Sequence, residues 1–396
     1  MNVRFAARIV SAALAFGVLQ SAGAQQAWLM TYGTAERVEE QFGHNAIWIR
    51  DPARGVDAVY NFGFFDFDKP GFYREFVFGE MIYYALARSP EEELAYYRWR
   101  DRDVRAQLLN LSDAQLRKLT QWLDDRVQPE TREFRYDYYF NNCSNRIRDG
   151  LDFALDGALS ASAKRQPAAM TFRQHTRRML GDAPLLYLGV QAALGRPADR
   201  PRTRWEEMFL PEVVARVAAD SAAAGRGLSD APLVLADRML YESTRPDDPE
   251  APAFAWALFV PLLIASLGVI LLPAGFASPS GRSRALFGAR AWILLSSTAG
   301  LLLLFLWVGT DHQAASRNEN LLLLNPLSLL LLRFRGDRVE RLAAGAVGVG
   351  LAAAVILKLL PGTQWNYEML LWLVPAQSAL LWTWRRSVSH AELRVR

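Results

Sequence analysis

Five apolar windows in the last third of the chain constrain its fold more than any other feature. They lie at about 254–276, 287–309, 320–332, 342–360 and 366–384. Four of them are long enough to cross a bilayer as α-helices, which takes roughly 20 residues. The third has only 13 residues and contains Asn325-Pro326. The sequence predicts an all-α transmembrane bundle of about five helices over residues 254–396.

Arginines indicate the orientation of this bundle. If all five windows cross and the N-terminal part is outside, the outer loops hold only Arg317. The inner loops and the tail then hold Arg282, Arg284, Arg290, Arg333, Arg335, Arg338, Arg341, Arg385, Arg386, Arg394 and Arg396. This is a positive-inside pattern. A re-entrant third window would place Arg333–Arg341 outside, so we expect that window to cross, with an unwound or tilted portion near Asn325, and we expect a cytoplasmic C-terminus.

The first residues have the pattern of a secretory signal. Arg4 and Arg8 precede an apolar stretch, and Ala22-Gly23-Ala24 ends it. We therefore predict a signal peptide over residues 1–24 with cleavage after Ala24. No cysteine follows the cut, so the later helices, rather than a lipid anchor, would hold the protein at the bacterial inner membrane with its N-terminal domain in the periplasm.

Residues 25–245 have the composition of a mixed α/β domain. His44–Arg50 and Asp57–Phe65 read as a β-hairpin with a longer loop. Glu91–Leu109 looks helical, and Cys143–Leu155 has apolar residues spaced by four on one helix face. An alanine-rich stretch, Glu206–Glu242, is expected to be a helical extension. The proline-rich and charged residues 246–253 form the predicted linker.

The chain has one cysteine, Cys143, which excludes an intramolecular disulfide and any thiolate-cluster metal site. Only four histidines are present. His390 falls in the predicted cytoplasmic tail, and we expect His175 to lie on a helix surface near several arginines. His44 begins a predicted strand, whereas Cys143 begins a predicted helix, where free amides and the helix dipole favour a thiolate. Cys143 and His44 are therefore a candidate nucleophile and base.

A third polar residue would orient the imidazole. If Arg50 pairs with Asp57 in the hairpin, Asn61 faces Ala46 and lies diagonal to His44 on the same sheet face. A one-residue slip would turn Asn61 to the other face, so Asp66 and Glu40 are alternatives. For the oxyanion, the backbone N–H of Cys143 is the natural donor, with Asn141 or Asn142 as helpers.

Several polar residues fall in or near the expected outer membrane face: His312, Asn318, Asn320 and Asn325. Polar groups inside a membrane are candidates for substrate handling. They could equally cap helices and bond to one another, and both interpretations stay open.

Three segments carry a resemblance to a known family. They are Tyr32-Gly33 through Glu39-Glu40-Gln41-Phe42-Gly43-His44-Asn45, Tyr60-Asn61-Phe62-Gly63, and Tyr136-Asp137-Tyr138-Tyr139-Phe140-Asn141-Asn142-Cys143-Ser144-Asn145-Arg146-Ile147-Arg148-Asp149. They resemble the periplasmic domain of the Lnb-type lipoprotein N-acyltransferases over roughly residues 27–200. The membrane half resembles that family more loosely, through Asp311-His312, Asn318-Glu319-Asn320-Leu321 and Asn325-Pro326-Leu327.

The resemblance implies an α+β, permuted papain-like periplasmic domain in which the histidine strand precedes the cysteine helix. It implies that Cys143 takes an acyl chain from a phospholipid as a thioester and passes it to an amine, in the family the N-terminal cysteine of a lipoprotein. No cofactor, metal or nucleic-acid partner is expected. A membrane-tethered cysteine peptidase or amidase acting on the cell envelope is the alternative, and a non-catalytic binding module is a third class.

Overall fold

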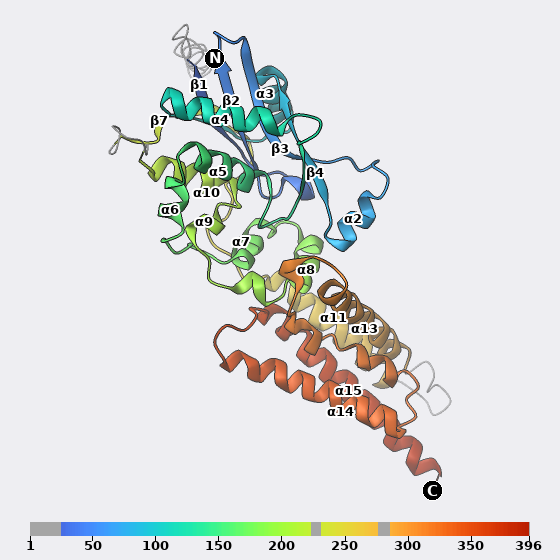
Figure 1. Ribbon diagram of the computed structural model, residues 1–396. Helices are drawn as coiled ribbons and strands as arrows, with labels where there is room; N and C mark the ends of the chain where they lie inside the picture. Colours follow the sequence, from blue (N-terminus) through green and yellow to red (C-terminus); the bar gives the residue numbers. More distant parts are fainter. Residues whose placement is uncertain (1–24, 223–230, 276–285, 396) are drawn as a thin grey trace, which may run out of the picture. The chain divides into compact units, whose positions relative to one another are not determined.

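The computed structural model describes residues 25–222, 231–275 and 286–395. The chain forms two compact units (Figure 1). The first holds the described residues up to Asp66 together with Ile82–Gln166 and Thr203–Pro246, and the second holds Phe67–Met81, Pro167–Arg202 and the described residues from Asp247 onward. The expected signal peptide and three expected inner-face arginines, Arg282, Arg284 and Arg396, lie outside the described residues.

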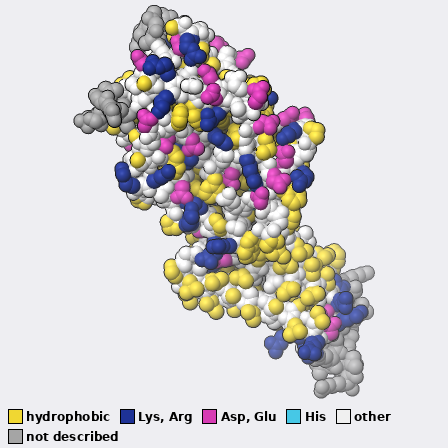
Figure 2. All heavy atoms as spheres, in the orientation of Figure 1, with side chains coloured by type: hydrophobic (Ala, Val, Ile, Leu, Met, Phe, Trp, Pro, Cys, Tyr) yellow, Lys and Arg dark blue, Asp and Glu magenta, His cyan; other side chains and the backbone are white. Residues whose placement is uncertain are grey.

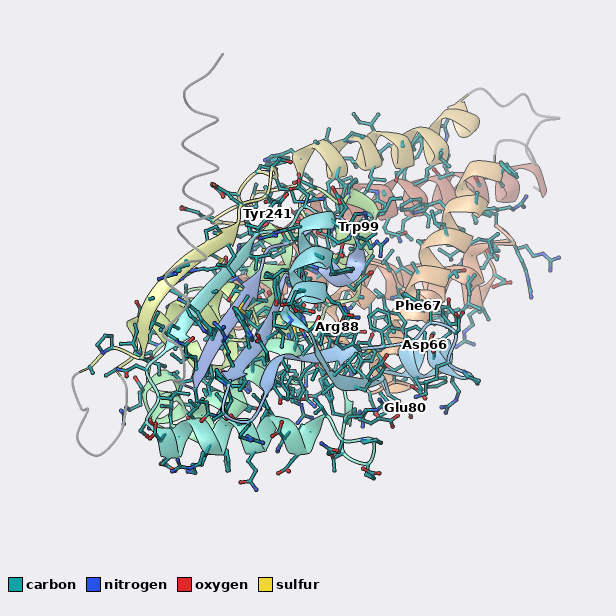
Figure 3. All side chains as sticks on the ribbon, turned by 90° about the horizontal axis from the view of Figure 1, so that it is seen from above. Asp66, Phe67, Glu80, Arg88, Trp99 and Tyr241 are labelled. Carbon is teal, nitrogen blue, oxygen red and sulfur yellow. The ribbon has the colours of Figure 1, made fainter. Side chains whose placement is uncertain are left out.

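A seven-stranded antiparallel sheet forms the centre of the first unit, in the order β6-β4-β3-β2-β1-β5-β7. The strands are β1 Gln26–Tyr32, β2 His44–Asp51, β3 Val56–Phe64, β4 Ile82–Arg88, β5 Val104–Leu109, β6 Glu133–Arg135 and β7 Val234–Tyr241. The helices of this unit are α3 Pro90–Trp99, α4 Asp113–Arg126, α5 Cys143–Ala154, α6 Ala158–Ala163, α9 Arg204–Glu207 and α10 Pro211–Asp220, with a 3₁₀ turn at Val38–Glu40. Figure 3 labels Arg88 at the end of β4, Trp99 at the end of α3 and Tyr241 at the end of β7.

The β2–β3 hairpin has the register that the sequence analysis assumed, with Arg50 opposite Asp57 and Ala46 opposite Asn61. Strand alternation sends every second side chain to one face. On that face Tyr97 of α3 packs into an apolar cluster with Trp28, Met30, Tyr32, Ala46, Trp48, Val59, Val104 and Ala106. Helix α5 lies against β2 and β3. Asn61 lies opposite Ala46, a member of that cluster, so α3 covers the sheet face that carries Asn61.

Two helical predictions were wrong at least in part. Glu91–Leu109 is not one helix, because Asp101 adopts a left-handed backbone conformation with φ of 49° and the chain turns from α3 into β5. The stretch Glu206–Glu242 is helical only in its first part, where α10 spans Pro211–Asp220. It ends in β7, whose side chains alternate between more and less exposed positions and which pairs with β5 at the sheet edge. Its alanine content concealed this period-2 pattern.

The second unit is helical. Its α-helices are α2 Phe72–Phe78, α7 Phe172–Met179, α8 Pro184–Ala193, α11 Trp256–Gly275, α13 Phe287–Val308, α14 Arg338–Ile356 and α15 Tyr367–Val395, and its 3₁₀ helices are Arg196–Asp199, Gln313–Ala315, Glu319–Leu322, Pro326–Leu331 and Leu357–Leu359. By length and composition, Phe287–Val308 and Arg338–Leu359 could cross a membrane. Hydrophobic side chains dominate the surface of this unit in Figure 2, and lysines and arginines gather at one end.

The third apolar window is not an α-helix. It consists of two 3₁₀ helices, Glu319–Leu322 and Pro326–Leu331, on either side of Asn325. It runs antiparallel along α13, because it follows the C-terminal end of that helix and its Leu332 carbonyl accepts a hydrogen bond from Arg290 at the other end. A Cβ at Gly300 of α13 would lie 1.9 Å from the Leu324 carbonyl oxygen, so glycine permits the close approach.

Residues 167–202 belong to the second unit because buried arginines of α7 bond within it. Arg173 pairs with Asp199 at 2.8 Å, and Arg177 pairs with Glu368 of α15 at 3.1 Å. His175 was expected on a helix surface, and that was wrong. The residue is 2% exposed, and its Nδ1 accepts a hydrogen bond from Arg178. The surrounding arginines suggested a solvated helix face, but buried partners satisfy them.

Candidate active site

Cys143 is the first residue of α5 and is partly exposed. The preceding residue, Asn142, caps the helix: its side-chain oxygen accepts from the Asn145 amide, and the Asn145 side chain bonds back to the Asn142 amide. This capping box fixes where the helix begins and leaves the Cys143 amide in the first turn, where N–H groups have no partner within the helix. The thiol therefore lies at the positive end of the helix dipole.

Gly63 lies beside Cys143, and its backbone conformation requires glycine. Gly63 sits at an irregularity in the β3–β4 pairing and has φ of 103°, a conformation that residues with a side chain rarely adopt. A Cβ there would lie 3.8 Å from the Cβ of Cys143. The bulge brings the backbone of β3 up to the Cys143 side chain.

His44, the first residue of β2, forms a hydrogen bond with Cys143. Burial raises the pKa of the Cys143 thiol, but the His44 imidazolium, its hydrogen bond, the Asn45 backbone amide and the Ser144 hydroxyl outweigh burial and lower that pKa to about 7. Burial lowers the pKa of His44, whereas the Cys143 thiolate raises it, with a net increase. Each group thus favours the charged form of the other.

The other side of the imidazole is held by Asn61. The Asn61 Oδ1 lies 3.0 Å from His44 Nε2, and its Nδ2 donates to the Val59 carbonyl at 3.2 Å. Because the amide oxygen faces the ring, Nε2 must carry the proton and donate it. Nδ1 is then left for the thiol, which is the tautomer that a base for Cys143 needs.

Glu93, a residue that the sequence did not single out, lies close to His44 and Asn61. It is 2% exposed on α3, beside Asn61, Tyr32 and His44. Burial raises the pKa of its carboxyl group, and the charge of His44, Arg88 and the hydroxyl and amide neighbours only partly offset this. The sequence offers three consecutive glutamates, 91–93, and only the orientation of α3 distinguishes the buried one from its two exposed neighbours.

The two alternatives to Asn61 lie elsewhere. Glu40 is bound by Arg100, with an N–O distance of 2.6 Å, and Arg102 also lies close to it. Asp66 is exposed in the loop after β3 (Figure 3). The contact with His44 is made by Asn61.

The two expected oxyanion helpers are engaged in the turn before α5. The Asn142 side-chain amide donates to the Tyr138 and Phe209 carbonyls, each at 2.9 Å, and the Asn141 side-chain amide donates to the Arg135 carbonyl. These bonds hold the turn that presents Cys143. The backbone N–H of Cys143 remains as the candidate oxyanion donor.

Aromatic side chains surround the pair. Tyr97 stacks on Tyr32 at 3.6 Å between ring centroids, and Tyr136 stacks on Tyr83 at 4.3 Å. Burial raises the pKa of Tyr97 and of Tyr136 well above 10, and in each case the Cys143 thiolate adds to the shift. Both phenols stay protonated at neutral pH. The side chains around Cys143 and His44 are therefore aromatic rings with neutral hydroxyl groups.

In the second unit, the polar residues near the expected membrane face bond to backbone. His312 Nε2 lies 3.1 Å from the Phe76 carbonyl oxygen. Asn320 donates to the Ala192 carbonyl and accepts from Asn366. Asn325 caps a 3₁₀ helix by accepting from the Leu327 amide. These contacts favour the interpretation in which the three residues cap and tie segments of the unit.

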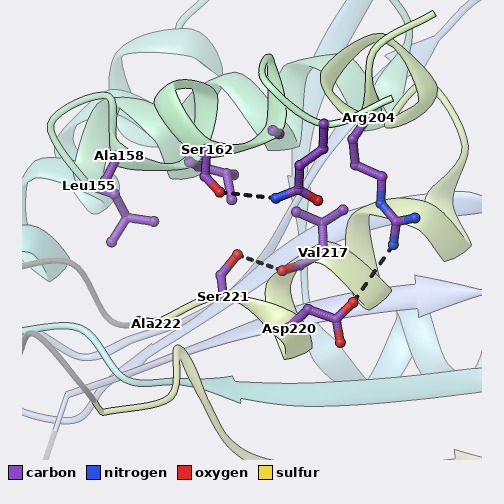
Figure 4. Close-up of a pocket in the computed structure, with 11 residues that line it drawn as sticks. Leu155, Ala158, Ser162, Arg204, Val217, Asp220, Ser221 and Ala222 are labelled. Carbon is purple, nitrogen blue, oxygen red and sulfur yellow. Dashed lines mark hydrogen bonds and ion pairs between the residues drawn. The ribbon is translucent and has the colours of Figure 1, made fainter. Parts of the chain in front are cut away.

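A cavity of about 250 Å³ lies elsewhere in the first unit (Figure 4). It is lined by residues of α6, α9 and α10, including Ser162 and an ion pair of Arg204 with Asp220 at 3.7 Å. Neither Cys143 nor His44 lines it. Within the described part of the chain, no three His, Cys, Asp or Glu side chains are grouped so that they could hold a metal ion.

Two family models match the chain. The Lnb N-terminal periplasmic domain matches residues 22–178, which include Cys143, His44 and Asn61. The Lnb transmembrane domain matches residues 254–342. No curated protein and no solved structure matches.

Proposed function

The chain belongs to the Lnb family and is a membrane protein with a periplasmic N-terminal domain, and from this premise we propose that it is a cysteine-dependent acyltransferase. The donor is a phospholipid, and the acceptor is an amine, the N-terminal cysteine of a lipoprotein. The observation that carries the proposal is the position of the His44 ring, which bonds Cys143 on one side and Asn61 on the other.

The first half-reaction forms a thioester. The Cys143 proton passes to His44 Nδ1, and the thiolate attacks the carbonyl carbon of a phospholipid ester. The resulting oxyanion is stabilised by the Cys143 N–H at the start of α5. As the C–O bond breaks, His44 returns the proton to the departing alkoxide, and a lysophospholipid leaves with that hydroxyl group.

The second half-reaction transfers the chain. The lipoprotein amine attacks the thioester carbonyl, His44 takes a proton from the nitrogen, and the departing sulfur regains a proton when the amide has formed. The acyl-enzyme links the two steps, so the kinetics are ping-pong. Asn61 is a positioning residue that keeps the His44 ring in the tautomer required by both steps.

We also propose that the first unit is a permuted papain-like domain, in which β2 with His44 precedes α5 with Cys143. The protein sits in the bacterial inner membrane with five crossings and a cytoplasmic C-terminus. The third crossing is supported by the path of Glu319–Leu331, which follows α13 toward Arg290. A 3₁₀ helix rises about 2 Å per residue, against 1.5 Å for an α-helix, so a short segment reaches farther.

The test is mass spectrometry of a model lipoprotein N-terminus, after expression of the wild type or Cys143→Ala in a host without its own N-acyltransferase. We expect a third acyl chain with the wild type and two with the variant. A correctly inserted wild type that adds no chain contradicts the transferase. Release of free fatty acid or cleaved envelope peptides instead would indicate a hydrolase.

A further inference from the structure

The segment Phe67–Met81 leaves the sheet between β3 and β4 and packs with the second unit. Figure 3 labels Asp66 and Phe67 before its helix, α2, and Glu80 after it. Three large side chains of α2 are exposed, Tyr73 by 68% and Phe76 and Val77 by 45% each. Phe67 is exposed by 54%, and its ring contacts Phe72, which also contacts Tyr73 and Phe76. Single exposed apolar residues are ordinary, but a contiguous group indicates a contact surface. We call these four exposed residues the α2 patch.

Two ion pairs lie beside the α2 patch, and Asp66 and Asp68 add negative charge on either side of Phe67. Lys69 pairs with Glu75 at 3.3 Å, and Arg74 pairs with Glu80 at 3.0 Å. The Arg74 guanidinium also lies 5.1 Å from the centre of the Phe78 ring. These pairs leave the short helix without a strong local field of either sign. The part of the α2 patch on the helix, formed by Tyr73, Phe76 and Val77, is therefore suited to an apolar contact rather than to a highly charged partner.

Hydrogen bonds fix α2 to the end of an apolar helix. The Asp311 amide donates to the Phe78 carbonyl at 2.8 Å, and the His312 ring donates to the Phe76 carbonyl at 3.1 Å. Gly79 allows the approach, because a Cβ there would lie 3.0 Å from the His312 nitrogen and its φ is 73°. These groups follow directly after α13, so α2 sits at the C-terminal end of that helix.

The apolar surface continues from α2 onto α13. Phe78 meets Phe305 edge to face with 5.6 Å between ring centroids. Beside Phe305, α13 exposes Trp307 by 40% and Val308 by 72%. Helix α13 is apolar over 22 residues and long enough to span a bilayer, and tryptophan near the end of such a helix is typical of the membrane–water interface.

We propose that the α2 patch lies at the membrane–water interface of the outer leaflet, with Tyr73, Phe76 and Val77 in contact with lipid. Short amphipathic segments bind there through aromatic and apolar side chains buried a few ångströms below the headgroups. The occupant is lipid because the patch is continuous with the exposed end of a span. This inference is independent of acyl transfer. If both hold, one strand, β3, carries Asn61 and leads directly into a lipid-contacting loop.

The test uses the full chain in phospholipid vesicles, with a fluorophore on a single cysteine. In a Cys143→Ser background the only thiol is the introduced one. Phe76→Cys reports on the α2 patch, Val308→Cys is the matched control for lipid contact, and Glu91→Cys marks an exposed position on α3. Each label is exposed in turn to lipids brominated on their acyl chains and to aqueous iodide.

We expect the Phe76 label to lose fluorescence to brominated lipid about as strongly as the Val308 label and to be protected from iodide relative to the Glu91 label. Quenching by iodide alone would place the patch in water and overturn the proposal. Protection from both quenchers would mean that protein covers the patch, a partner or a second copy, and would overturn it equally.

Discussion

The Cys143 thiol should titrate near pH 7 because of His44, and removing His44 should displace that titration by two units or more. The pKa of Cys143 is lowered from 9.0 to about 7. Two pKa units correspond to about 2.7 kcal/mol of preference for the thiolate. In His44→Gln this preference is lost while burial remains, so the pKa should rise to about 9 or above.

The single cysteine makes the assay specific. The rate of reaction with a small disulfide reagent, measured against pH, gives the thiol pKa as its midpoint. At pH 7 the thiolate fraction should fall from about one half to about one hundredth. The thiolate of higher pKa is, however, roughly 6- to 10-fold more nucleophilic. The rate at pH 7 should therefore drop only about 5- to 8-fold, whereas the midpoint moves by the full two units.

The midpoint is thus the decisive readout. His312→Gln, in the second unit, is the matched control and should keep the midpoint near 7. A wild-type midpoint at 8.5 or higher would refute the ion pair, as would an unchanged midpoint in His44→Gln. Folding of each variant is checked by its thermal transition, so that an unfolded thiol is not mistaken for a shifted one.

Three further predictions concern Asn61, Gly63 and Gly300. Asn61→Ala should lower kcat by about 10-fold or more, since general acid–base catalysis contributes 10²–10⁴-fold, and Glu93→Gln should lower kcat by a smaller factor. A KM unchanged within twofold and an unchanged thermal transition would show that the loss comes from positioning rather than from folding. Full activity of Asn61→Ala would contradict the role of that side chain. Gly63→Ala should cost about 1–2 kcal/mol of stability through its positive φ, seen as a lower Tm; an unchanged Tm would count against strain at the bulge. Gly300→Ala should lower the thermal transition of the protein in detergent, because the new Cβ would meet the Leu324 carbonyl. Gly345→Ala is the control and should leave the transition unchanged, because nothing lies within 4 Å of its new Cβ. Equal shifts for the two variants would argue against the close packing at Gly300.

The sequence could indicate the two candidate catalytic residues, Cys143 and His44, because their positions are locally encoded. A histidine at the start of a segment with strand composition and a cysteine at the start of a periodic helix are visible without tertiary information. The hairpin register was an assumption that left a one-residue slip open, and the structure has the assumed register, with Asn61 opposite Ala46. Glu93 could not be found in this way, because the side of α3 that faces the sheet is decided by packing.

Two predictions that rested on amino-acid composition rather than on periodicity were wrong at least in part. Alanine suggested a helix before Tyr241, but the edge of β5 was available to pair with an alternating segment. Arginines around His175 suggested solvent, but Asp199 and Glu368 lie far away in sequence and satisfy them inside the second unit. The short third window could be expected to unwind near Asn325, but its path along α13 depends on Gly300, a contact that only the folded chain shows.

The most direct test of the account is to look for the acyl-enzyme itself. Intact-protein mass spectrometry of the full chain, mixed with phospholipid in the absence of an amine acceptor, should show one added acyl chain on the wild type. Neutral hydroxylamine should remove it, an amine acceptor should consume it, and Cys143→Ala should never acquire it. A folded wild type that stays unmodified, or an adduct that persists in Cys143→Ala, would contradict the claim that Cys143 carries the chain.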